Sequence, residues 1–146
     1  MAILLIDMIS LSLWYEVRQA DGLVAATPAE LDAALTTIAN HRGPEWAAVA
    51  EITFTEDWET GPLLYAGFYK VAGILWFSGP GERNAWVSRD PTRSDSSIVQ
   101  FMYCENEFEV PSDAILPAPL IRWAVHEFAE TGERPTCLLW QEWQPV

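Results

Sequence analysis

The segment from Trp46 to Tyr103 is a series of short apolar and aromatic runs separated by residues that favour turns. These runs predict β-strands at Trp46–Phe54, Leu63–Lys70, Ile74–Ser78, Ala85–Ser88 and Ile98–Glu105. The connections are too short for crossover helices, so successive strands are expected to pair antiparallel. A meander is the simplest such arrangement, with a tight turn at Ala72-Gly73, but the pattern leaves the strand order open.

A helix is predicted upstream of these strands. Thr27 can cap its first turn, Pro28 is tolerated at the first helical position, and Glu30 can reach back to complete a capping box. Apolar residues then recur at helical spacing, and we expect the helix to end near Asn40 or His41.

A second helix is predicted after the pair Pro117 and Pro119, with a wide apolar face along 120–128. Thr131-Gly132 supplies its C-terminal stop, where we expect Gly132 to adopt a positive φ.

Two further strands are expected at the ends of the chain, at Ala2–Val17 and Thr136–Trp143. The fold class predicted from all these elements is α+β: an antiparallel sheet of about five to seven strands, with two main helices packed on one face. A length of 146 residues, with no repeat and no linker, predicts a single domain over 1–146. The apolar N-terminus lacks the basic region that a signal peptide would have, and it is too short and polar to span a membrane. We therefore expect a cytoplasmic protein with no membrane contact.

The charge of the chain is strongly negative. Its 21 acidic residues and 8 basic residues give a formal net charge of -13 at pH 7. Such a surface repels phosphate backbones and favours basic partners, so we expect no direct binding of nucleic acid. Solubility alone is the competing explanation of the acidity.

No catalytic, metal-binding or cofactor-binding pattern is recognisable in the sequence. Cys104 and Cys137 lie in apolar runs typical of reduced cysteines, and neither pairs with His41 or His126 at a metal-ligand spacing. A Ser/His/Asp triad is not excluded by one sequence, but neither histidine has the context of a nucleophile's base. We therefore expect a protein that is not an enzyme and that uses no metal and no cofactor.

Two acidic clusters are the candidate partner-binding residues. The first is Glu56, Asp57, Trp58 and Glu59, in an expected loop where an aromatic residue flanked by acids suits a binding anchor with a charged rim. The second is Glu105, Glu107 and Glu109, which would project from one side of a continuing strand while Phe108 takes the other. An ordinary loop with Trp58 folded inward, and a solvated strand edge, are the alternatives.

Two other classes of function stay open on the residues alone. One is a small hydrolase that uses two of the many carboxylates. The other is a binding module for a small ligand with an aromatic-lined pocket, for which the 8 Trp residues provide material.

Several motifs together resemble a known family. They are the capped helix start at 27–32, Trp76-Phe77-Ser78-Gly79, Pro117 before a helix, Glu127-Phe128-Ala129-Glu130-Thr131-Gly132-Glu133-Arg134-Pro135, and a last strand with Trp140 and Glu142. In this order they resemble the Immunity protein 1 family of bacterial polymorphic toxin systems, over nearly the whole chain.

The resemblance implies a non-enzymatic inhibitor encoded beside a secreted toxin, which is often a nucleic-acid deaminase. Such an enzyme needs an open basic groove for its substrate strand, and an acidic protein could occlude that groove and the active site. Trp76 and Trp140 have a structural interpretation as core residues, and Arg134 is expected to pair with an acid that holds the second helix to the last strand.

Overall fold

The computed structural model describes residues 8–41, 43, 47–80, 85–93, 97–104 and 106–143. The helices formed by these residues are α1 (Pro28–Asn40), α2 (Ala118–Thr131) and the short 3-10 helix η1 (Ser112–Ala114). The strands are β1 (Leu11–Trp14), β2 (Leu23–Ala25), β3 (Ala48–Phe54), β4 (Leu63–Tyr69), β5 (Ala72–Ser78), β6 (Trp86–Arg89), β7 (Ile98–Tyr103), β8 (Asn106–Pro111), β9 (Leu116–Pro117) and β10 (Leu139–Glu142).

Most of the strands form one antiparallel sheet in the order β10-β6-β5-β4-β3-β1-β2, and β9 pairs with β5 beside this path. Strands β7 and β8 form a separate antiparallel pair. Because β3, β4, β5 and β6 are neighbours both in the chain and in the sheet, the predicted meander is confirmed for these four strands. The fifth predicted strand, Ile98–Glu105, is observed as β7 and lies outside this sheet. The predicted α+β class is confirmed as well.

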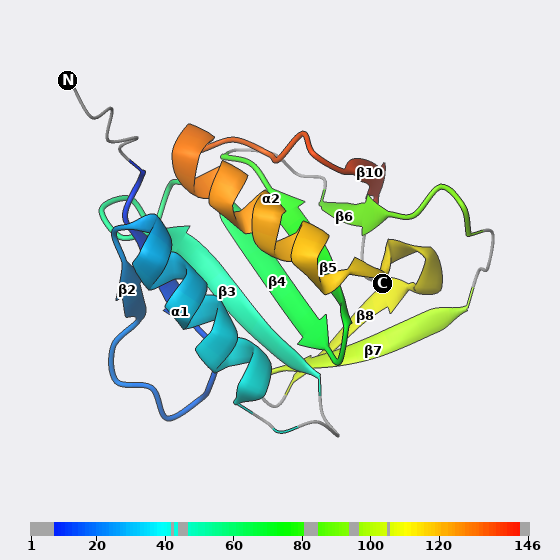
Figure 1. The fold of residues 1–146 in the computed structure, drawn as a ribbon, viewed down its shortest axis with the longest axis horizontal. Coiled ribbons are helices and arrows are strands. Elements are labelled where there is room, and N and C mark those ends of the chain that lie inside the picture. The colour runs from blue at the N-terminus through cyan, green and yellow to red at the C-terminus, as the bar shows by residue number, and fades with distance from the viewer. Residues whose placement is uncertain are drawn as a thin grey trace.

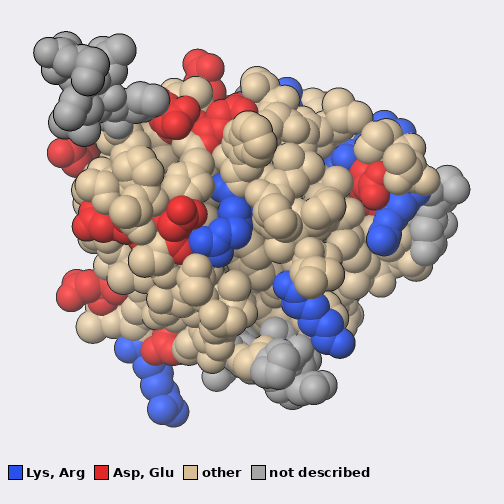
Figure 2. Space-filling model, in the orientation of Figure 1, with Lys and Arg blue, Asp and Glu red and all other residues tan. Residues whose placement is uncertain are grey.

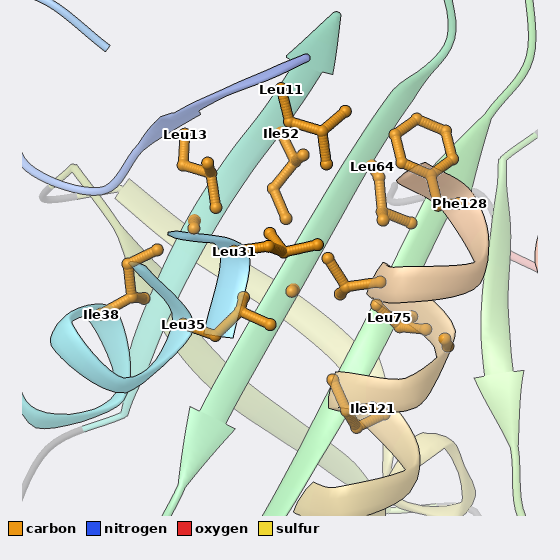
Figure 3. Packing of buried hydrophobic residues seen from close by; sticks show 14 of the residues in the cluster. Leu11, Leu13, Leu31, Leu35, Ile38, Ile52, Leu64, Leu75, Ile121 and Phe128 are labelled. Atoms are coloured by element: carbon orange, nitrogen blue, oxygen red, sulfur yellow. The ribbon is translucent and has the colours of Figure 1, made fainter. Parts of the chain in front are cut away.

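Both helices contribute to one hydrophobic cluster with the sheet. Alternate residues of the strands point to this side, because successive side chains of a strand project to opposite faces. Figure 1 shows α1 and α2 lying across the front of the sheet. The cluster includes the side chains labelled in Figure 3: Leu11, Leu13, Leu31, Leu35, Ile38, Ile52, Leu64, Leu75, Ile121 and Phe128.

The opposite face of the sheet is covered by the β7–β8 pair, which crosses behind the sheet in Figure 1. Here Val49 of β3 and Ile74 of β5 pack against Phe101 of β7 and Val110 of β8. The sheet is thus buried on both faces, by helices on one side and by a hairpin on the other. The hairpin layer has no counterpart in the predicted architecture.

The tight turn between β4 and β5 lies at Lys70-Val71, not at Ala72-Gly73 as predicted. Lys70 adopts the left-handed conformation, with φ 56, while Gly73 lies inside β5. A Cβ atom at Gly73 would lie 3.0 Å from Cγ1 of Ile121 and 2.5 Å from the carbonyl oxygen of Gly67. This glycine therefore permits the close packing of α2 on the sheet, which the turn interpretation missed.

The ends of α1 follow the predicted chemistry. The Thr27 hydroxyl accepts a hydrogen bond from the Glu30 amide (3.2 Å), and Pro28 is the first helical residue. The Glu30 carboxylate accepts from the amide of Ala26 (3.1 Å), one residue before the cap. The helix ends at Asn40.

The start of α2 was predicted too late in the chain. The helix begins at Ala118 and includes Pro119 in its first turn, where the missing N–H group would have no partner within the helix. Its end is as predicted, with Gly132 at φ 71 as the left-handed cap. In the described part of the chain, no helix is long and apolar enough to cross a membrane.

The terminal strands are shorter than predicted. From the Ala2–Val17 prediction only β1 is a strand, and residues 1–7 lie outside the described residues, as does Trp46 at the start of the Trp46–Phe54 prediction. The side chain of Gln19 ends β1 by donating to the Leu13 carbonyl (2.9 Å) and accepting from the Tyr15 amide (3.0 Å).

The last strand starts at Leu139 and not at Thr136. The amide of Thr136 donates to the Glu127 carboxylate at the end of α2, which keeps this segment off the sheet. Nearby, the Arg134 guanidinium lies over the ring of Trp86 at 4.4 Å from its centroid and at 5.8 Å from that of Trp140. These cation–π contacts hold the segment after α2 to β6 and β10, where an ion pair had been predicted; no ion pair of Arg134 is found among the described residues.

The hydroxyl of Ser88 joins three elements in the interior. It is fully buried, accepts from the Leu75 amide of β5 (3.0 Å) and donates to the carbonyl of Ala114 in η1 (2.6 Å). The bond between the Leu75 amide and the Ser88 hydroxyl takes the place of a backbone bond at the end of the β5–β6 ladder. It ties the hairpin side of the molecule to the sheet.

We predict that Ser88→Ala lowers the free energy of unfolding by about 1–3 kcal/mol, because two buried backbone groups lose their partner. Urea denaturation with an unchanged m-value is the measurement. Thr37→Ala is the control, since the Thr37 hydroxyl is exposed and bonds only within α1 (3.0 Å to the Ala33 carbonyl). Equal stabilities of Ser88→Ala and Thr37→Ala would contradict this role of Ser88.

The two helices are joined by a polar cluster around Asp32. Its Oδ1 atom lies 2.8 Å from Nε2 of His126 and 3.3 Å from Nη2 of Arg122, both on α2. The hydrogen bond with His126, and then the charges of His126 and Arg122, lower the pKa of Asp32 although its partial burial opposes this. The folded state thus favours the ionised carboxylate, and this stabilisation is present above the ordinary pKa of 3.8 and lost as the pH falls through the lower folded value.

We predict that Asp32→Asn lowers the free energy of unfolding at pH 7 by less than about 1 kcal/mol, because solvent screens this exposed group. The difference from the parent protein should shrink as the pH falls below 3.8. Thermal or urea unfolding between pH 7 and pH 3 measures it. A difference that is constant or grows towards acid pH would show that the charge of Asp32 does not hold the helices together.

Candidate partner-binding site

A concave pocket of about 470 Å³ lies on the β1 side of the sheet, on the face away from the helices. It is open to solvent. Its lining comes from β1 and the segment after it, from β3, from the β3–β4 loop and from the turn between β7 and β8. The lining residues are Ser12, Trp14, Glu16, Val17, Gln19, Glu51, Thr53, Trp58 and Cys104.

Strand register brings the floor of the pocket together. In the β1–β3 pair Ser12 is opposite Thr53, and Trp14 is opposite Glu51. Their neighbours in the strands, such as Leu13 and Ile52, belong to the helix-side cluster. The four floor residues therefore project to the other face, where they form one continuous patch.

The indole of Trp14 is fixed against the backbone of the β1–β2 hairpin. A Cβ atom added at Gly22 would lie 3.0 Å from both Cε2 and Nε1 of Trp14, so the absence of a side chain at Gly22 lets the ring lie close. The Gln19 bonds that end β1 set the course of the segment that carries Glu16 and Val17 to the pocket.

Glu51 lies in a row of aromatic residues that crosses four strands, from Trp14 to Tyr65 and Trp76. The hydroxyl of Tyr65 points to Oε2 of Glu51 at 3.5 Å, and the rings of Tyr65 and Trp76 meet edge to face at 5.2 Å. Burial, and next the charge of Glu51, raises the pKa of Tyr65 to about 12. The phenol thus stays protonated and available as a donor to the carboxylate at neutral pH.

The charged groups of the lining have one sign. Glu16 and Glu51 line the pocket, and no lysine or arginine is among the described residues that line it. Glu16 also contacts Nε2 of His41 at 3.1 Å, which ties the rim of the pocket to the end of α1. The described lining of the pocket therefore combines carboxylates with indole rings.

Thr53 supplies an unused polar group at the floor. The residue is only 5% exposed, and its hydroxyl oxygen is buried with no hydrogen-bond partner among the described residues. The neighbouring hydroxyls do have partners, since the Thr55 hydroxyl lies within hydrogen-bond distance of the hydroxyls of Ser10 (3.1 Å) and Ser12 (3.0 Å). A buried hydroxyl without a partner is costly, and it would gain free energy from a donor that entered the site.

The first predicted acidic cluster lies on the β3–β4 loop. Glu56, Asp57, Trp58 and Glu59 are all exposed, and Trp58 is 65% exposed. The loop is closed by the Gly61 amide, which donates to the Asp57 carbonyl (3.0 Å), and by the Thr60 hydroxyl, which donates to the Asp57 carboxylate. Trp58 is not folded inward but lies at the pocket, while its role in binding stays a prediction.

The second predicted cluster is only partly described. Glu105 lies outside the described residues. The predicted strand does not continue as one strand, because β7 ends at Tyr103, Cys104 has φ 46, and β8 runs back antiparallel to β7. Glu107 and Glu109 are exposed on β8, where the Gln100 amide lies 3.5 Å from each carboxylate. Neither lines the pocket, so the structure does not bring them together with Trp58 as one site.

The sequence interpretation missed the residues of the pocket floor, although a signal for them exists. In β3 the apolar run Ala48-Val49-Ala50 gives way to Glu51-Ile52-Thr53, so the second face turns polar halfway along the strand. Ser10 and Ser12 alternate with Leu11 and Leu13 in the same way. This alternation marks where the second face of the sheet loses its cover.

The described residues can be compared with the metal-ligand and cysteine patterns of the sequence. They contain no group of three or more His, Cys, Asp or Glu side chains that could hold a metal ion. Cys104 and Cys137 are half-buried and form no disulfide. Burial, and next the nearby Glu127 carboxylate, raises the pKa of the Cys137 thiol, which keeps it protonated and weakly nucleophilic.

Comparison with known families gives a match to Immunity protein Imm1 over residues 19–142. Comparison with curated proteins gives no match. The matched region runs from Gln19 at the pocket, through the meander and both helices, to the end of β10. The match covers most of the chain, which therefore belongs to the Imm1 family of immunity proteins.

Proposed function

We propose that this protein binds a cognate bacterial toxin and neutralises it by occluding the toxin's active site, without catalysing a reaction. Membership of an immunity protein family supports a toxin as the partner. The observation that carries the proposed mode of binding is the open pocket, whose described lining has two tryptophans, two carboxylates and no basic residue. Aromatic residues supply contact area at interfaces, and charge steers the encounter.

The proposed interface is centred on the pocket and on the acidic loop of Glu56, Asp57, Trp58 and Glu59. Trp58 and Val17 are exposed apolar side chains at this site, 65% and 60% exposed, and they would be buried in a complex. Glu105, Glu107 and Glu109 are proposed as an outer acidic rim that acts mainly on the rate of association.

The helix side of the molecule is less suited to a basic partner. Figure 2 shows acidic side chains at the left and top of this side, and lysine and arginine side chains at its centre, lower edge and right. The charged residues in the described part of the pocket lining, in contrast, are Glu16 and Glu51, which are both acidic.

The proposed toxin has a basic cleft that holds nucleic acid, and a nucleic-acid deaminase is the specific candidate. Such an enzyme keeps a zinc-bound water beside a groove for the substrate strand. The net charge of -13 lets an inhibitor compete with a polyanion for that groove. We further propose that residues 1–146 act as one domain in the cytoplasm, with no cofactor, no nucleic acid and no membrane bound directly.

We predict that association with the toxin depends steeply on salt. The partner in this experiment is the cognate toxin domain that the proposal requires, to be sought at the C-terminus of a secreted protein encoded by a neighbouring gene. Its association rate constant, measured by stopped-flow fluorescence, should fall at least ~10-fold between low and high ionic strength. Charge reversal at Glu105, Glu107 and Glu109 should slow association with little effect on dissociation. A rate that is insensitive to both changes would show that the acidic surface does not steer the encounter.

We predict that Trp58→Ala weakens the complex by at least ~30-fold, about 2 kcal/mol, as expected for an aromatic hot spot. Trp123→Ala is the matched control, because Trp123 on α2 is similarly exposed, at 68% against 65% for Trp58. Its dissociation constant should stay within about twofold of the parent value, since Trp123 lies outside the proposed interface. Titration calorimetry measures both, and the reverse order of effects would place the toxin on the helix side.

A further inference from the structure

We propose that the β-turn at residues 16–19 is a preformed contact element for the toxin, in which Val17 makes the contact and Gln19 is a positioning residue. That the partner is a toxin rests on the function proposed above. The toxin surface that fits this turn is an apolar hollow, because Val17 stands at the corner of the turn.

The turn follows β1 and projects beside the pocket. Its backbone hydrogen bond runs from the Gln19 amide to the Glu16 carbonyl (3.4 Å), which is the bond of a β-turn. Val17 and Arg18 are the two central residues, and both side chains are exposed. Val17 is 60% exposed and lines the same pocket as Trp58. The turn therefore presents an apolar side chain within the proposed interface.

The side chain of Gln19 fixes the turn to the end of β1. Its Nε2 atom donates to the Leu13 carbonyl (2.9 Å), and its Oε1 atom accepts from the Tyr15 amide (3.0 Å). Leu13 and Tyr15 precede the turn and Gln19 ends it, so the two bonds hold both ends of the turn together. Because the amide nitrogen and oxygen each have a partner within the chain, Gln19 acts on the toxin through the course of the turn.

A second anchor joins the turn to the end of α1. Oε2 of Glu16 lies 3.1 Å from Nε2 of His41, and the rings of Tyr15 and His41 meet edge to face with their centroids 4.9 Å apart. His41 is the residue that caps the C-terminus of α1. The turn is thus held from the sheet and from a helix, and a contact that is fixed before binding loses less entropy in the complex.

The two corner residues indicate the kind of surface that the turn meets. Val17 is stabilised when an apolar surface removes it from water. Arg18 beside it carries a positive charge, which the floor of a basic groove would repel. The turn therefore fits an apolar hollow at the rim of the proposed basic groove, and not the floor of that groove.

Gln19→Ala tests the positioning role in the free protein. The amide hydrogen of Tyr15 loses its acceptor, so its exchange with solvent, followed by NMR, should become at least ~10-fold faster. Gln100→Ala is the matched control, because Gln100 is an exposed glutamine on β7 whose side chain contacts Glu107 and Glu109 instead. It should leave the exchange of the Tyr15 amide unchanged. Equal exchange rates in Gln19→Ala and Gln100→Ala would overturn the positioning role.

Val17→Ser and Gln19→Ala are then compared in complex with the cognate toxin domain by surface plasmon resonance. Each should raise the dissociation rate constant at least ~5-fold while the association rate constant stays within about twofold. The double variant should dissociate within about twofold of Val17→Ser alone, because Gln19 acts through Val17. Val71→Ser is the control for an exposed valine, at 83% exposure on the β4–β5 turn, and should dissociate like the parent protein.

Failure of the turn and failure of the proposed function give different results. A toxin domain that binds the parent protein and Val17→Ser equally well would reject the turn and keep the immunity function. Multiplying effects of Val17→Ser and Gln19→Ala in the double variant would reject the link between the two residues. Because Val17 is exposed, Val17→Ser decides even if Gln19→Ala is unstable. A toxin domain that does not bind the parent protein would reject the proposed function, and the role of the turn with it.

Discussion

The alternation of side chains along β3 is the constraint on which the rest of the structure depends. Its residues Ala48, Ala50 and Ile52 face the helices, and Val49 faces the β7–β8 pair. Glu51 and Thr53 continue the second face beyond that cover. Because the period of a strand is two, one seven-residue strand supplies both cores and the floor of the pocket.

Burial on both faces also explains how the proposed binding site can be rigid while the pocket is open. The helix-side cluster and the hairpin-side cluster hold β3 from two directions, so Glu51 and Thr53 are positioned by a rigid strand. The loop that carries Trp58 is closed by the bond from the Gly61 amide to the Asp57 carbonyl, and Glu16 contacts His41. Sites on rigid elements lose less entropy when a partner binds.

Local chemistry made much of the fold predictable from the sequence. Thr27, Pro28 and Glu30 marked the start of α1, and Gly132 marked the end of α2, because caps depend on a few neighbouring residues. The meander followed from short connections. The β7–β8 layer could not be predicted in this way, since its packing on Val49 and Ile74 is a contact between distant segments of the chain. Gly73 was wrongly predicted to be a turn residue for the same reason. Its role is to let Ile121 of α2 lie close to the sheet, which is a contact between distant segments.

The candidate site was predictable only in part. Trp58 was found because an aromatic residue among acids is visible in a linear sequence. Trp14, Glu51 and Thr53 were missed because only strand register brings them together. Glu107 and Glu109 share a strand face as predicted, but the turn at Cys104 sets the hairpin's course, and neither residue lines the pocket.

Hydrogen–deuterium exchange of the protein, alone and in complex with the toxin domain, tests most directly whether the toxin binds at the pocket and the β3–β4 loop. We expect protection of residues 11–19, of the β3–β4 loop at 55–61 and of the turn around Cys104, with little change along the exposed side of α2. Protection centred on α2 around Trp123, with none at the β3–β4 loop, would contradict it.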